Sequence, residues 1–120
     1  MIRELPKKEW PSFLQSFSLQ HDGWLVSVES VRDDRCEVKA SDLALEGVTV
    51  QDAPREIVIT VGEGDEHHRF VVRRPQRVLV ESDGGVDKSI SVQQDDGTIT
   101  RVRFRSAIAP ELVDGILPFA

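Results

Sequence analysis

The stretch Ser89-Ile-Ser-Val-Gln-Gln-Asp-Asp-Gly-Thr-Ile-Thr-Arg-Val-Arg-Phe104 decides the fold class of this chain. Apolar and polar residues alternate in both halves, and the Asp96-Gly97 pair between them is a strong signal for a tight β-hairpin. Similar short runs precede it at 24–31, 36–40, 48–51, 56–61, 67–72 and 77–81, with a bend expected at 43–47. Pro75 is expected to mark a bend or a sheet edge. The sequence therefore predicts an antiparallel sheet of about seven or eight short strands over residues 24–105.

A single helix is expected before the sheet. Apolar side chains recur there at i, i+3, i+4 and i+7, which is typical of a helix with one apolar face: Trp10, Phe13, Leu14 and Phe17. Gly23 is a natural stop, so the helix is predicted over about residues 8–20. One helix is too few for parallel βαβ units. We therefore expect a mostly-β (α+β) fold, with the helix packed on a curled antiparallel sheet or small barrel.

The length of 120 residues allows one hydrophobic core but not two. We find no repeat, low-complexity stretch or linker, so the prediction is a single domain over residues 1–120. The segment 106–120 is apolar enough that we expect it to dock as a tail. Cys36 is the only cysteine, which excludes an intramolecular disulfide.

The charge balance bears on partners and location. The net charge of −6 argues against non-specific nucleic-acid binding, which depends on neutralising phosphates. The charge is uneven, because residues 69–105 hold eight Lys and Arg against five Asp and Glu, and such asymmetry points to a binding face. No stretch of signal-peptide or membrane-spanning length is found. We expect a cytoplasmic protein with no membrane partner.

Four segments resemble a bacterial family known only as a domain of unknown function. They are Leu5-Pro-Lys-Lys-Glu-Trp-Pro-Ser-Phe-Leu-Gln-Ser-Phe-Ser-Leu-Gln-His-Asp-Gly-Trp24, Leu43-Ala-Leu-Glu-Gly-Val48, Pro75-Gln-Arg-Val78 and Phe104-Arg-Ser-Ala-Ile-Ala-Pro-Glu-Leu-Val-Asp-Gly115. The resemblance covers about residues 5–115. It implies a bacterial source and a small stand-alone protein, but no activity and no site residues.

A row of arginines is one candidate binding site. Alternation places Arg101, Arg103 and Arg105 on one face of the last predicted strand, and Arg73 and Arg77 lie on strands that could be neighbours. Guanidinium groups on a sheet face can bind RNA phosphates or an acidic partner. The alternative, which we favour, is a solvated face whose arginines pair across strands with Asp and Glu. Base-stacking aromatic residues are scarce on that face.

The C-terminal tail is the other candidate surface. Its apolar residues must be buried on the domain itself or on a partner: Leu112, Val113, Ile116 and Leu117. We favour docking on the domain itself, with a homodimer contact as the second choice.

No catalytic, metal or cofactor site is expected. The adjacent residues His67 and His68 point to opposite faces of a strand and cannot readily share an ion. At the end of a helix, His21 with Asp22 is better explained by the helix dipole and a turn than by acid–base chemistry. A lone Cys36 without a flanking signature is usually a small packed residue.

These observations favour a non-enzymatic interaction module that binds a protein partner or a second copy of itself. The alternative is a small β-barrel that binds RNA through its arginine-rich sheet face. An enzyme of unknown class is the third reading.

Overall fold

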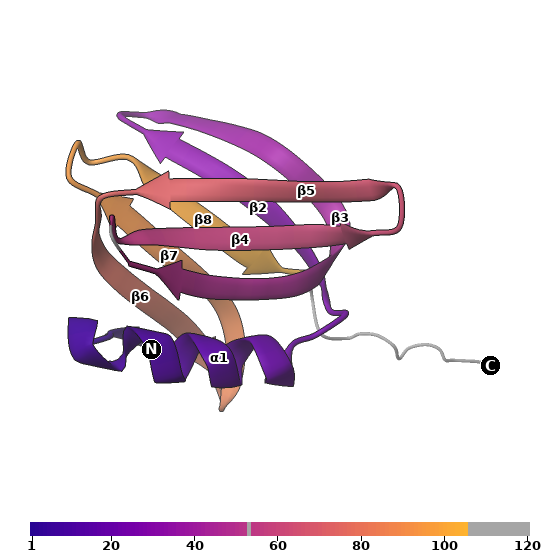
Figure 1. Cartoon of the computed structure of the whole chain (residues 1–120), viewed down its shortest axis with the longest axis horizontal. Coiled ribbons are helices and arrows are strands. Elements are labelled where there is room, and N and C mark those ends of the chain that lie inside the picture. The colour runs from indigo at the N-terminus through magenta and orange to yellow at the C-terminus, as the bar shows by residue number, and fades with distance from the viewer. Residues whose placement is uncertain (53, 106–120) are drawn as a thin grey trace.

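The computed structural model describes residues 1–52 and 54–105. The predicted tail residues Leu112, Val113, Ile116 and Leu117 lie outside this part. The elements in chain order are β1 (Ile2–Glu4), a 3₁₀ turn (Lys7–Glu9), α1 (Trp10–Gln20), β2 (Leu25–Arg32), β3 (Arg35–Gln51), β4 (Glu56–Glu63), β5 (Glu66–Arg73), β6 (Pro75–Asp83), β7 (Val86–Gln94) and β8 (Ile99–Phe104). The predicted class, one N-terminal helix with an antiparallel sheet, is confirmed (Figure 1).

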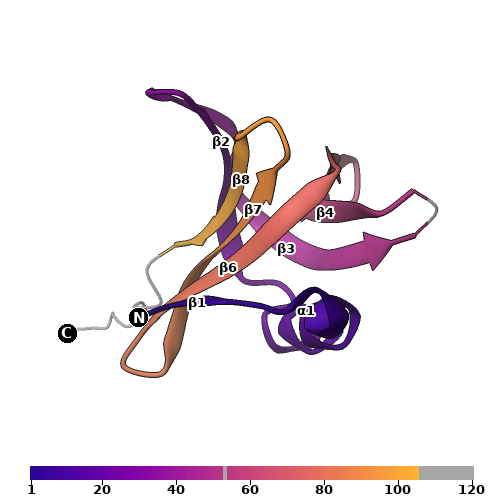
Figure 2. The ribbon, with the colours of Figure 1, turned by 90° about the vertical axis from the view of Figure 1, so that its left-hand side faces the viewer.

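The eight strands form one sheet in the order β1-β6-β7-β8-β2-β3-β4-β5, and every pairing is antiparallel. The sheet curls strongly, and α1 lies at one end of the curl, beside β3 (Figure 2). Within the described residues it does not close, because β1 and β5 at the two ends each have only one paired neighbour. Of the two predicted forms, the curled sheet is confirmed and the closed barrel is wrong.

The longest strand, β3, makes the curl possible. The two strands predicted at 36–40 and 48–51 are parts of this one strand of 17 residues, and the bend predicted at 43–47 lies within it. Its first part pairs with β2 and its second part with β4, with a register shift between Leu45 and Gly47. An extra residue of this kind increases strand twist and turns the sheet. The predicted bend is therefore a bulge within a continuous strand.

The bend predicted at Pro75 is confirmed. Arg74, directly before it, is a bend with a positive φ of 49° that separates β5 from β6, and Pro75 is the first residue of β6. Proline is tolerated at the first residue of a strand, whereas inside a strand its missing N–H would remove a hydrogen bond from the ladder. The strand β1 was not predicted, since three residues carry too little periodicity to be recognised.

The core lies between the inner faces of the curled sheet and the apolar face of α1. Trp10, Leu14 and Phe17 are buried there as predicted, whereas Phe13 is only half-buried. The Phe17 ring lies 5.6 Å from the ring of Phe104 at the end of β8. The helix is therefore an integral part of the core.

Polar contacts also fix α1 to the sheet. The Ser18 hydroxyl accepts a hydrogen bond from the backbone N–H of Val48 at 2.8 Å and donates to the carbonyl of Leu14 at 2.7 Å. At the other end of the helix, Trp10 Nε1 donates to the carbonyl of Leu5 at 3.1 Å. Both ends of α1 are anchored.

Candidate functional site

The predicted arginine row starts on β8, where Arg101 and Arg103 point away from the core residues Val102 and Phe104. On the neighbouring strand β2, Glu29 Oε1 lies 3.6 Å from Arg101 Nη1 and 3.2 Å from Arg103 Nη2. The Glu29 side chain is only 13 % exposed. One carboxylate thus serves as the counter-ion for two guanidinium groups, which is the cross-strand pairing favoured from the sequence.

The other three predicted arginines are also paired with carboxylates. The partner of Arg105 is Asp42 at 3.6 Å, that of Arg73 is Glu56 at 3.7 Å, and that of Arg77 is Glu4 at 2.9 Å. The hydrogen bond from Arg77 holds the pKa of the Glu4 carboxyl below its usual value.

The five arginines do not form one row. The strand β7 separates β6, which carries Arg77, from β8, and Arg73 lies on β5 at the far end of the sheet order. The structure therefore brings together only the pair on β8, around Glu29.

A buried histidine has a different partner from the one considered in the sequence. The ring of His21 packs against the rings of Phe17, Trp24 and Phe104, with centroids 4.4, 4.7 and 4.6 Å away. Its Nδ1 donates to the carbonyl of Phe17 at 2.8 Å, since a carbonyl can only accept. Its Nε2 lies 3.4 Å from Asp87 Oδ2 on β7.

The contact with Asp87 joins the end of α1 to β7, so His21 holds the helix against the sheet. No local signal in the sequence pairs the two residues, because only the fold of the sheet brings the start of β7 under the end of α1.

The other candidates from the sequence do not assemble into a site. His67 contacts Glu46, whereas the ring of His68 stacks on Phe70 at 6.4 Å. In the described part of the chain, no group of three or more metal-ligating side chains is found. Cys36 is exposed on β3.

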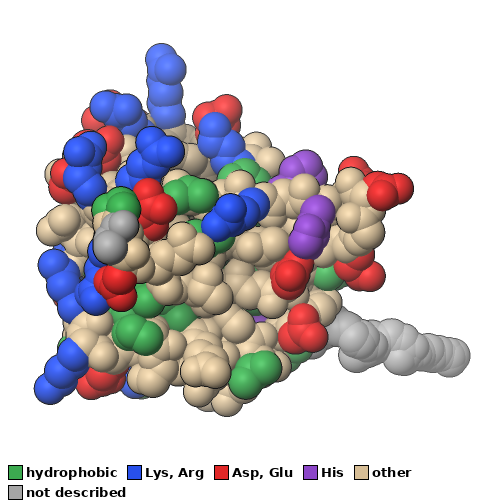
Figure 3. All heavy atoms as spheres, viewed as in Figure 1, with side chains coloured by type: hydrophobic (Ala, Val, Ile, Leu, Met, Phe, Trp, Pro, Cys, Tyr) green, Lys and Arg blue, Asp and Glu red, His purple; other side chains and the backbone are tan. Residues whose placement is uncertain are grey.

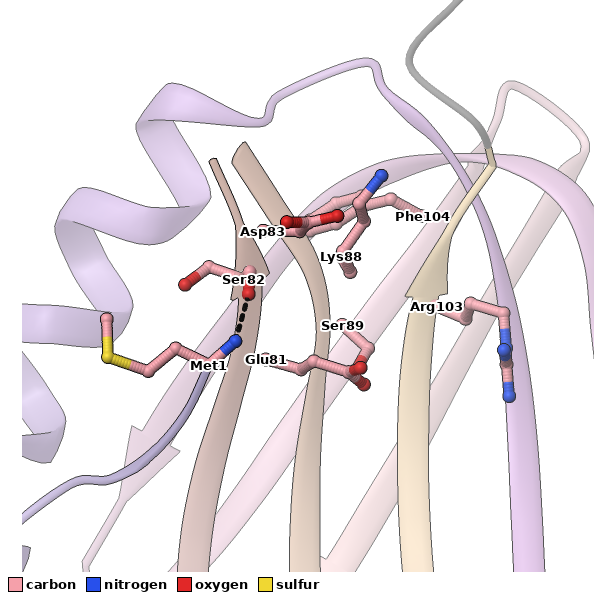
Figure 4. A pocket seen from close by; sticks show the side chains of 8 residues that line it. All are labelled: Met1, Glu81, Ser82, Asp83, Lys88, Ser89, Arg103 and Phe104. Carbon is pink, nitrogen blue, oxygen red and sulfur yellow. Dashed lines mark hydrogen bonds between the residues drawn. The ribbon is translucent and has the colours of Figure 1, made fainter. Parts of the chain in front are cut away.

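An open depression of about 460 Å³ lies at the ends of β6, β7 and β8 (Figure 4). The charged groups in it have both signs, and its lining residues are Met1, Glu81, Ser82, Asp83, Lys88, Ser89, Arg103 and Phe104. The N-terminal ammonium donates to the Ser82 carbonyl, and the Ser89 hydroxyl donates to Glu81 Oε1 at 3.3 Å. No histidine is among the lining residues, so Ser89 lacks the usual base of a serine nucleophile.

A family model matches residues 1–112 and describes a family of unknown function, DUF5335. The chain belongs to the DUF5335 family. The match includes all of the described helix and strands, and it confirms the membership in an unknown-function family that the sequence resemblance implied. A bacterial source stays a prediction. Comparison of this DUF5335 domain with the curated proteins finds no match, and comparison with the solved structures finds none either.

The free edge of the sheet is the feature of the DUF5335 domain that the sequence did not reveal. The strand β5 has eight residues and pairs with β4 without any register shift, from Glu66 to Arg73. Among residues 1–52 and 54–105 it has no other strand neighbour. Near its end, the Gln94 side chain donates to the carbonyl of Arg73 at 3.0 Å.

Basic and apolar side chains lie along the second half of this edge, whereas the acidic Glu66 stands at its start. Val71 is 42 % exposed, and the Arg73 side chain is 77 % exposed. Lys, Arg and His side chains gather over the part of the surface that β5 crosses (Figure 3). The edge can form a backbone hydrogen-bond ladder with another extended segment, as edge strands generally can.

No helix in the described part of the DUF5335 domain has the length and apolar character that crossing a membrane requires.

Proposed function

We propose that this DUF5335 domain is a non-enzymatic interaction module that binds an extended segment of a partner protein along the free edge of β5. The observation that carries the proposal is the regularity of this edge. Folded proteins usually protect an edge strand with charged side chains, lysine above all, or with a proline, a bulge or a very short length. β5 carries the charged residues Glu66, Arg69 and Arg73, but it has eight residues, no register shift, no proline and no lysine. Such an edge is suited to β-strand addition.

The opposite edge makes a useful contrast. The strand β1 has three residues, all exposed, and in the part of the chain that the structure describes it pairs only with β6. An edge of this length offers a partner too few backbone groups for a stable ladder. The asymmetry between the two edges supports β5 as the binding side.

The surroundings of the arginines favour a protein partner over RNA. Arg101 and Arg103 share the counter-ion Glu29, and a phosphate would have to compete with that carboxylate. The net charge of −6 adds a repulsive long-range field for nucleic acid. RNA binding through this face would give an affinity that falls steeply with salt, whereas strand addition depends mainly on backbone hydrogen bonds.

The proposal is tested by selecting short random peptides on the purified protein and measuring their affinity for three single variants. Val71→Lys places an edge-protecting lysine on β5 at a half-exposed position, and Ile2→Lys does the same at the 67 % exposed Ile2 on β1. We expect Val71→Lys to weaken binding at least about tenfold and Ile2→Lys to leave it unchanged.

The third variant, Leu19→Lys, tests a competing site. Leu19 is 75 % exposed and lines a groove between α1 and β3. Loss of binding in this variant, with binding retained in Val71→Lys, would place the interaction in the helix groove and contradict the proposal.

A further inference from the structure

We propose that the segment bound by β5 has the pattern acidic–apolar–apolar–apolar–acidic. This inference rests on the proposed function and deepens it by naming the chemistry of the partner. It follows from the side chains that β5 presents at its edge and from the strand that already pairs with it.

The edge of β5 has basic residues on either side of an apolar centre. Arg69 and Arg73 flank Phe70, Val71 and Val72. Val72 is buried in the core and Phe70 packs against it, so these two side chains point inward. Because side chains alternate along a strand, Arg69, Val71 and Arg73 point to the outer face.

The two arginines differ in how far their charge is satisfied. The Arg73 side chain has Glu56 at 3.7 Å but stays largely exposed, and its carbonyl accepts a hydrogen bond from Gln94 that a bound strand would replace. Arg69 is exposed, and none of the ion pairs found among residues 1–52 and 54–105 includes it. An acidic residue placed opposite Arg69 on the free side would supply a countercharge that the described part of the chain does not provide.

The strand β4 shows which residues β5 accepts opposite this stretch. The register pairs are Glu56 with Arg73, Ile57 with Val72, Val58 with Val71, Ile59 with Phe70 and Thr60 with Arg69. An acidic residue faces one arginine, and three β-branched apolar residues face the apolar centre. Only the position opposite Arg69 departs from the pattern, because a threonine stands there.

On the outer face of β4 and β5, two neighbouring valines form an apolar stripe that ends at the free edge. Val58 is only 3 % exposed although it does not belong to the main core, and its register partner Val71 is half-exposed at the edge. An apolar residue of a bound strand opposite Val71 would continue this stripe and cover it. Apolar and oppositely charged cross-strand pairs are the ones that stabilise sheets.

The pattern reads the same in both directions, so it fits a parallel or an antiparallel segment. It differs from a general preference for acidic proteins, since the spacing of the two acidic residues must match that of Arg69 and Arg73, four residues apart on one strand.

The test uses three synthetic peptides with serine flanks: Ser-Ser-Glu-Ile-Val-Ile-Glu-Ser-Ser, the same peptide with both Glu replaced by Lys, and a permuted form, Ser-Ser-Ile-Glu-Val-Glu-Ile-Ser-Ser. Affinities are measured by fluorescence anisotropy, and the bound site is mapped by backbone amide NMR. We expect the first peptide to bind at β5 at least about tenfold more tightly than the other two.

Protein variants supply the reciprocal test. Arg69→Glu combined with Arg73→Glu should invert the preference, so that the lysine peptide binds more tightly than the glutamate peptide. Arg32→Glu combined with Arg35→Glu, at the exposed residues where β2 ends and β3 begins, makes the same change in net charge; this control should leave the preference unchanged. Circular dichroism checks that each variant is folded, and the peptide comparison on the unaltered protein does not depend on the variants.

The outcomes separate the inference from the proposed function. Peptides that bind at β5 with equal affinity whatever their charge would overturn the pattern and leave strand addition in place. If no peptide, including those from the random selection, perturbs the amides of β5, both proposals are wrong.

Discussion

Replacing Phe17 by alanine should be among the most damaging single changes in this domain. Its side chain is 1 % exposed and contacts the rings of His21 and Phe104, with centroids 4.4 and 5.6 Å away. Removing a buried phenylalanine costs about 3–5 kcal/mol, since the transfer free energy is lost and a cavity remains. That is a large part of the roughly 5–15 kcal/mol that stabilises a typical domain.

The free energy of unfolding is measured by urea denaturation, followed by Trp fluorescence and circular dichroism. We expect a lower midpoint with an unchanged slope, because the surface exposed on unfolding stays nearly the same. The matched control is Phe13→Ala, four positions earlier on the same helix, where the side chain is half-buried and carries Arg3 5.3 Å above its ring. About half the loss is expected there. Equal losses in the two variants, or a loss below about 1 kcal/mol for Phe17→Ala, would refute the assignment of the buried face of α1.

Three further predictions concern local contacts at the helix, at the β4–β5 turn and at the first strand. Ser18→Ala leaves the N–H of Val48 without the acceptor it has at 2.8 Å, so the free energy of unfolding should fall by about 1–3 kcal/mol, measured by urea denaturation. Gly62→Ala should destabilise by more than about 3 kcal/mol in a thermal melt, because φ is +102° there and a Cβ would lie 1.7 Å from the Glu66 carbonyl oxygen. The contact with Arg77 lowers the pKa of Glu4, so its stabilising effect is present above the normal pKa of Glu and is lost as the pH falls through the lowered pKa of the folded state. An NMR titration of the Glu4 carboxyl should show this lowered pKa, and Arg77→Ala should raise the pKa of Glu4.

The elements of the fold could be predicted from the sequence where periodicity was strong. The helical spacing from Trp10 to Phe17 gave α1, and Asp96-Gly97 gave the β7–β8 hairpin, where Gly97 has the expected positive φ of 89°. The continuity of β3 could not be predicted, because a bulge and a chain break leave the same signature of small and turn-forming residues in a sequence.

The candidate site depends on strand order, which local patterns do not encode. The run 67–72 was predicted as a strand, but nothing in it shows that β5 lies at the end of the sheet. The pairing of Glu29 with two arginines of β8 and the contact between His21 and Asp87 join segments that are distant in sequence. Such contacts follow from the tertiary fold alone.

The central claim is that an extended partner pairs with the free edge of β5. It is tested most directly by hydrogen–deuterium exchange of the β5 backbone amides, followed by NMR with and without the tightest peptide from the selection. In an antiparallel pair, every second N–H of β5 already bonds to β4, and the others point away from it. We expect the amides that point away to become protected on binding, in alternation along Glu66–Arg73, while those bonded to β4 change little. Protection confined to α1 or to the outer face of β8, or no change in β5, would contradict the account.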